Sequence, residues 1–184
     1  MFGILDPSIR TIEKTHSPSG LNTSDSIMET TQERTDYEQE RGKPLPSVNH
    51  SRLQIRLSVA LFEYEPEYTV LSELALELNG KRFTPDLCVY PPLEVNYQED
   101  TLRKTEPPLL AVEIVSPSQS TQDVVDKITA MLDAGVQSCW LVQPTTETVT
   151  IFTPGNKPRT VSTGTIQDPT TDIEVEISAI FDDG

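Results

Sequence analysis

Two runs of alternating apolar and polar residues flank the dipeptide Asn79-Gly80, and this arrangement constrains the fold more strongly than any other part of the sequence. YTVLSELALEL precedes the dipeptide and, after one lysine, RFTPDLCVY follows it. A period of two is typical of β-strands, and Asn-Gly suits the positive φ angles of a two-residue turn. The sequence therefore predicts an antiparallel hairpin over residues 68–90.

The register of this hairpin follows from the length of its turn. With a two-residue loop, Glu77 lies opposite Arg82, which is a favourable cross-strand ion pair. Glu73 then lies opposite Asp86, and two carboxylates that face each other on one ladder destabilise a sheet. A bound divalent cation would offset their repulsion. The alternatives are a bulge at Pro85 that shifts the register, or two acids that simply face solvent.

A third strand is predicted at PLLAVEIVS, residues 108–116, which is almost continuously apolar, as strands buried on both faces are. Its one charged residue is Glu113. Acidic side chains are rarely buried without a partner, so Glu113 is a functional candidate in its own right. The alternative is an ion pair with a stray lysine or arginine, which we consider less favoured because residues 49–184 contain only nine basic residues.

One helix is predicted before the hairpin, in SRLQIRLSVALFEY, residues 51–64. Its leucines recur at helical spacing, although the same segment also alternates, which leaves a strand as the alternative. The length of the segment favours a helix of about four turns. We expect an apolar face made of Leu53, Leu57 and Leu61 and widened by Ile55, Val59 and Phe62.

A second helix is predicted in DVVDKITAMLDAG, residues 123–135, with a capping arrangement at Ser120 and Asp123. Lys127 lies at the edge of its apolar stripe, where an ion pair with Asp123 would contribute roughly 0.2–0.5 kcal/mol. Two apolar strands, SCWLVQP and TVTIFTP, follow as a hairpin that closes the sheet. The tail IEVEISAIF predicts a further strand and a short terminal segment.

The composition divides the chain into a polar leader, residues 1–48, which is predicted to be weakly ordered, and one domain, residues 49–184. The net charge of −15 is not typical of a protein that grips nucleic acid through its phosphates. Without a long apolar run or a signal-like N-terminus, we expect a cytoplasmic protein with no membrane partner. Trp140, Cys88 and Cys139 are expected in the core, the cysteines as free thiols.

Five short motifs occur in a fixed order: Pro85-Asp86, EIVSPS from Glu113 to Ser118, Lys127, AGV at residues 134–136 and WLV at residues 140–142. Together they resemble the bacterial "putative restriction endonuclease" family of the PD-(D/E)XK nuclease superfamily, over about residues 50–153. The resemblance implies an α/β fold with a restriction-endonuclease-like core, in which a mixed central β-sheet is flanked by helices.

The resemblance also implies a reaction. Asp86 and Glu113 match the metal-binding carboxylates of the family, and Lys127 matches a lysine that family members commonly carry on the following helix. The usual superfamily lysine, two residues after the second acid, is replaced by Val115. We expect Mg²⁺ (or Mn²⁺) as the cofactor, Glu73 as a further metal ligand, and DNA as the substrate.

Three functions stay open at this point. The first is a metal-dependent DNA endonuclease with Asp86, Glu113 and Lys127 as its catalytic residues, and a homodimer is compatible with it. The second is a catalytically silent nuclease fold that serves as a binding or regulatory module, which the acidic composition and Val115 favour. The third is a structural domain whose acidic residues share no role. Metal-dependent cleavage separates the first function from the others, and metal binding without cleavage would single out the second.

Overall fold

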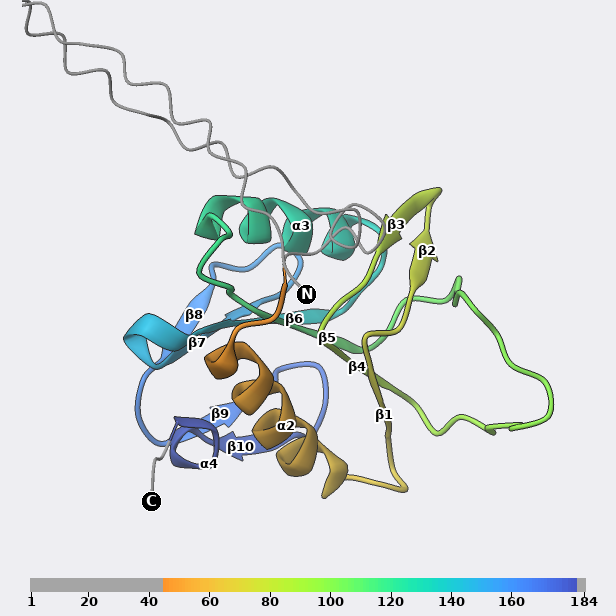
Figure 1. The fold of residues 1–184 in the computed structure, drawn as a ribbon, viewed down its shortest axis with the longest axis horizontal. Helices are drawn as coiled ribbons and strands as arrows, with labels where there is room; N and C mark the ends of the chain where they lie inside the picture. Colours follow the sequence, from red (N-terminus) through yellow and green to blue (C-terminus); the bar gives the residue numbers. More distant parts are fainter. Residues whose placement is uncertain (1–44, 182–184) are drawn as a thin grey trace, which may run out of the picture. The chain divides into compact units, whose positions relative to one another are not determined.

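A mixed six-stranded β-sheet is the centre of the computed structural model, which describes residues 45–181 (Figure 1). The strand order is β1-β4-β5-β6-β7-β8, with β5 and β6 parallel and all other neighbours antiparallel. The strands are β1 (Thr69–Ser72), β4 (Leu87–Tyr90), β5 (Leu110–Ile114), β6 (Ser138–Gln143), β7 (Thr148–Phe152) and β8 (Arg159–Val161). The predicted mixed sheet is confirmed, but β8 rather than β7 forms its last strand.

Helices cover both faces of this sheet. Helix α3 (Thr121–Asp133) lies on one side, and α2 (Val48–Phe62) lies on the other together with α4 (Ile177–Phe181) (Figure 1). The two clusters of buried residues reflect this division, since Val112 of β5 belongs to the α2 cluster and its neighbour Ala111 to the α3 cluster. Two covered faces explain why the sequence of β5 is apolar at almost every position.

The predicted hairpin is present, but it is split into two ladders. Near the turn, β2 (Leu76–Leu78) pairs with β3 (Lys81–Phe83), and farther away β1 pairs with β4 in the same register. Glu77 lies opposite Arg82, as predicted, with 3.8 Å between Oε2 and Nε. The N–H of Glu73 donates to the carbonyl of Asp86 at 3.1 Å, which confirms that these two residues lie side by side.

The ladder is interrupted on both strands around this contact. Glu73 has a φ of 52°, in the left-handed region that non-glycine residues seldom adopt. Residues 73–75 and 84–86 consequently leave the strand geometry, and the β2–β3 hairpin departs from the main sheet (Figure 1). Asn79 and Gly80 have φ angles of 50° and 75°, as the predicted two-residue turn requires.

Helix α2 is a helix and not a strand, and it begins at the N-cap Ser47, whose hydroxyl accepts the N–H of His50 at 3.2 Å. The predicted leucines are buried, but the expectation that other apolar residues widen this face is wrong. Ile55, Val59 and Phe62 are 66%, 62% and 62% exposed. At about 100° per residue these three side chains point away from the buried stripe, so they form a separate apolar strip on the surface.

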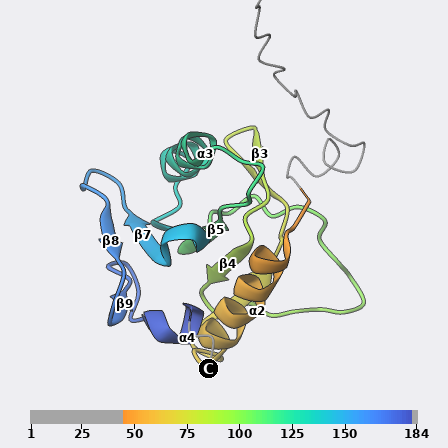
Figure 2. The ribbon, with the colours of Figure 1, turned by 60° about the vertical axis from the view of Figure 1, so that its left-hand side comes forward.

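The C-terminal segment completes the core on the α2 side of the sheet. As predicted, it contains a strand, β10 (Glu174–Glu176), and a short helix, α4; β10 pairs with β9 (Thr165–Gln167) in a small separate sheet. In Figures 1 and 2 alike, α4 lies beside α2. The guanidinium of Arg56 fastens the two helices, since its Nε donates to the carbonyl of Ala179 at 2.8 Å.

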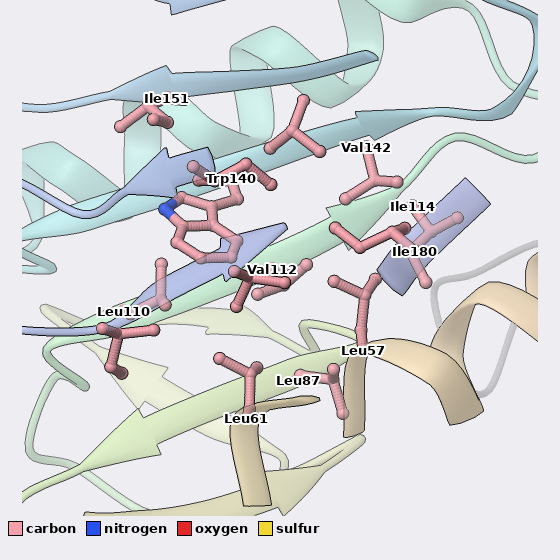
Figure 3. Close-up of a cluster of buried hydrophobic side chains, with 14 of the residues drawn as sticks. Leu57, Leu61, Leu87, Leu110, Val112, Ile114, Trp140, Val142, Ile151 and Ile180 are labelled. Atoms are coloured by element: carbon pink, nitrogen blue, oxygen red, sulfur yellow. The ribbon is translucent and has the colours of Figure 1, made fainter. Parts of the chain in front are cut away.

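Trp140 lies fully buried in this core, as predicted, among side chains from the sheet, α2 and α4 (Figure 3). Its indole N–H donates to Asp168 Oδ2 at 2.9 Å. Asp168 is buried as well, and its other carboxylate oxygen accepts the backbone N–H groups of Thr170 and Thr171. These bonds explain how an acidic residue can be buried here for a structural purpose.

The remaining expectations concern the thiols, the leader and the membrane. Cys88 and Cys139 are buried free thiols, as predicted. The predicted leader, residues 1–48, lies outside the described residues except for its last four. Among the helices of the described part, none combines the length and the apolar character that crossing a membrane would require.

Leu57 and Val59 of α2 provide a direct test of this packing. Leu57 is fully buried and Val59 is exposed, although they are only two positions apart. We expect Leu57→Ala to lower the free energy of unfolding by about 2–5 kcal/mol, because a cavity remains in the core. Val59→Ala should change it by less than about 0.5 kcal/mol. Urea denaturation followed by circular dichroism measures both, and equal losses would contradict the orientation of α2.

Candidate active site

Asp86 lies in the irregular segment that precedes β4, and β5 holds it in place. Its backbone N–H donates to the carbonyl of Val112 at 3.0 Å. Its carboxylate Oδ2 accepts the backbone N–H of Ile114 at 2.7 Å, so a side chain occupies an acceptor position that a strand carbonyl usually fills. Asp86 is only 2% exposed. The carboxylate is therefore anchored directly beside Glu113, the residue that precedes Ile114.

Glu113 is the second-to-last residue of β5; it is buried, with 3% exposure, and forms an ion pair with Lys127. Lys127 Nζ reaches from α3 to within 2.6 Å of Glu113 Oε1. The ion pair that we considered less favoured from the sequence is thus present. Lys127 pairs with Glu113 of β5, so its role is not limited to the surface of its own helix. The pair offsets part of the cost of burying a carboxylate.

The predicted catalytic residues come together from three parts of the chain. Lys127 Nζ also donates to the carbonyl of Thr84 at 3.0 Å, two residues before Asp86. Lys127 therefore bridges β5 and the segment that carries Asp86. Glu73 lies next to Asp86 through its backbone and is half-buried.

Two further residues at this site escaped the sequence analysis. His50 is buried, and its Nε2 lies 3.2 Å from Asp86 Oδ1. Gln54, one turn later in α2, donates its side-chain amide to the backbone carbonyl of Asp86 at 3.3 Å. One sequence feature could have pointed to His50: it lies at helical spacing from Leu53 and Leu57, at a position of the buried stripe where an apolar residue is usual.

Cys139, a buried thiol of β6, does not serve as a nucleophile or metal ligand in this site. Burial raises the pKa of Cys139, and the negative charge of Glu113 raises it further. At neutral pH the thiol therefore stays protonated, and a protonated thiol is a poor nucleophile and a poor metal ligand.

The donor set of the site suits a hard divalent cation. Glu113 of β5 and Asp86 of the segment just before β4 both offer carboxylate oxygens, and Mg²⁺ is commonly held by one or two carboxylates together with water and phosphate oxygens. In residues 45–181 no three His, Cys, Asp or Glu side chains are arranged as a complete metal cage. The two carboxylates fit an ion that retains several water ligands, and the role of Glu73 as a further ligand stays a prediction.

Comparisons with known proteins agree with this fold. A family model named Uma2 and described as "putative restriction endonuclease" matches residues 26–179. A solved structure of a "putative nuclease belonging to DUF820" from Anabaena variabilis ATCC 29413 is 22% identical, with a TM-score of 0.65. The match covers 75% of this chain and 83% of that chain, and at this identity it shows a shared fold. None of the curated proteins compared with the chain matches it.

The Glu113–Lys127 pair can be tested by a double-mutant cycle. We expect Lys127→Met to destabilise the protein more than Glu113→Gln does, because it leaves a buried carboxylate without its counter-charge. The coupling free energy should lie at about 0.5–3 kcal/mol, as for residues in direct contact. The control pairs Glu113→Gln with Lys157→Met, since Lys157 is an exposed lysine in the loop between β7 and β8. A coupling as small as that of the control would contradict the ion pair.

Proposed function

We propose, from the premise that the chain belongs to the Uma2 family of putative restriction endonucleases, that it hydrolyses phosphodiester bonds in DNA with Mg²⁺ or Mn²⁺. The family assignment supports nuclease function in general. The observation that carries the more specific proposal is the gathering of Asp86, Glu113 and Lys127, two buried carboxylates and one ammonium group, at one end of β4 and β5.

The charge of this group supports a cation. Asp86 and Glu113 are 2% and 3% exposed, so two carboxylates, one on β5 and one on its neighbouring segment, lie close to each other with little access to water. Buried charge is costly unless it is offset, and a divalent ion would offset it strongly. The precise anchoring of Asp86 by the Ile114 N–H also favours a functional role, since the orientation of a carboxylate matters more in a metal site than in a packed core.

Asp86 and Glu113 would hold the ion, whose chemistry is to lower the pKa of a bound water and to neutralise charge on a phosphate. Lys127 is the more exposed member of the group, so its ammonium can meet a phosphate that approaches from solvent. There it would stabilise the negative charge that develops during attack. The carbonyl of Thr84 keeps the ammonium over the site.

A DNA substrate must be reconciled with the net charge of −15. Two exposed basic residues, Lys81 and Arg82, begin strand β3, which leads directly to Thr84 and Asp86. Three residues of extended chain span roughly 10 Å, so these side chains lie within reach of phosphates a few nucleotides from the scissile one. Lys81 and Arg82 would therefore place positive charge near a phosphate backbone at this site, although Arg82 is also paired with Glu77 and the whole molecule is acidic.

Thermal melting with metal ions, followed by a cleavage assay, tests the proposal. Mg²⁺ or Mn²⁺ at about 100 times its dissociation constant should stabilise the wild type by about 2.7 kcal/mol. Asp86→Asn and Glu113→Gln should abolish this response, because each removes a ligand charge. Lys127→Met should retain most of the response and lose about 100-fold or more of the cleavage rate on a DNA plasmid.

The control is Asp133→Asn, which neutralises an exposed acidic residue at the end of α3 and should keep both the response and the cleavage. A wild-type melting curve that ignores both metals would contradict the metal site. Metal binding without cleavage of any DNA would instead support the catalytically silent module and overturn the nuclease activity.

A further inference from the structure

His50 occupies an unusual place for a polar residue. It lies in the first turn of α2, 6% exposed, and its position continues the stripe that buries Leu53, Leu57 and Leu61 against the sheet. An apolar side chain would satisfy packing at such a position, and burying a polar ring without good partners costs stability. Packing alone therefore does not explain why a histidine occupies this position.

The contact with Asp86 supplies that reason. His50 Nε2 lies 3.2 Å from Asp86 Oδ1, within hydrogen-bonding reach, and a carboxylate oxygen can only accept. The proton of the ring must therefore be on Nε2 for this contact to be favourable. Nδ1 is buried and has no hydrogen-bond partner among the described residues, so the side of the ring that faces Asp86 is the one that is satisfied.

Asp86 is thus held from two directions. Ile114 of β5 donates to Oδ2 at 2.7 Å, and His50 of α2 lies against Oδ1. With one contact alone, the carboxylate could still rotate about its Cβ–Cγ bond. Contacts to both oxygens, from different elements, fix the plane of the carboxylate. Gln54 adds a bond from the same helix to the backbone carbonyl of Asp86.

We propose that His50 is a positioning residue: it fixes the plane of the Asp86 carboxylate so that the carboxylate presents its oxygens to a divalent cation. This inference rests on the proposed function and adds α2 to the machinery of the site. Partners that orient a metal-binding carboxylate typically change metal affinity by about 10–100-fold when they are removed.

Three substitutions separate the role of Nε2 from packing. In His50→Gln the side-chain amide nitrogen can take the place of Nε2, in His50→Asn the shorter side chain can replace only Nδ1, and His50→Leu keeps the volume without a donor. The readout is the dissociation constant of Mn²⁺ for the full chain, measured from the electron paramagnetic resonance signal of the free ion. We expect His50→Leu and His50→Asn to bind Mn²⁺ about 10–100-fold more weakly, and His50→Gln to stay within about 3-fold of the wild type.

Ser47→Ala is the matched control, because Ser47 caps the same turn of α2 through the N–H of His50, and this bond involves neither ring nitrogen of His50. It should lower the melting temperature and leave the Mn²⁺ affinity unchanged. A His50 that only supports the fold predicts the opposite pattern, in which all variants lose stability and none changes its affinity. That result, or equal affinities for His50→Gln and His50→Asn, would overturn the proposal.

The outcomes also distinguish this inference from the proposed function. If the wild type binds Mn²⁺ with the expected pattern among the variants but cuts no DNA, the nuclease activity falls and the role of His50 stands. If the wild type and the His50 variants bind Mn²⁺ alike while the wild type cuts DNA, the role of His50 falls and the nuclease activity stands. A wild type that does not bind Mn²⁺ overturns both the metal site and the role of His50.

Discussion

The hydrogen bond from the Ile114 N–H to the carboxylate of Asp86 is the interaction on which the rest of the site depends. It fastens the irregular segment before β4 to the central strand β5, at the residue next to Glu113. The neighbouring elements attach to the same place: α3 through Lys127 and Thr84, and α2 through His50 and Gln54. Side chains from the helices on both faces of the sheet therefore contact this pair of buried carboxylates. The position of the two carboxylates thus depends on the packing of both helix layers.

The sequence predicted the parts of this site that local patterns determine. Strict alternation around Asn79-Gly80 defined the register, and the contact between Glu73 and Asp86 is the contact that this register requires. Glu113 could be identified because it is a single charge in a strand that is otherwise apolar. The ion pair with Lys127 was undervalued, because a count of basic residues ignores geometry. Helix α3 packs over Ala111 and its neighbours in the sheet, and this packing brings a lysine over Glu113.

The sequence did not predict the parts that depend on contacts between distant segments. His50 lies 36 positions before Asp86 and just before the helix predicted at residues 51–64, and nothing in the sequence around it indicates a carboxylate partner. Ile55, Val59 and Phe62 were placed on the core face because they are apolar, but the turn of the helix directs them to the surface. The left-handed φ of Glu73 also could not be foreseen, because the alternating pattern continues through the residue at which the strand breaks.

Crystals soaked with Mn²⁺ test the central claim most directly, because the anomalous scattering of the ion reports its position independently of activity. The account predicts one strong anomalous peak at bonding distance, about 2.0–2.3 Å, from oxygens of both Asp86 and Glu113. It further predicts that the peak disappears in Asp86→Asn crystals. A peak elsewhere on the molecule, or none near these two carboxylates at millimolar Mn²⁺, would contradict the assignment of the site.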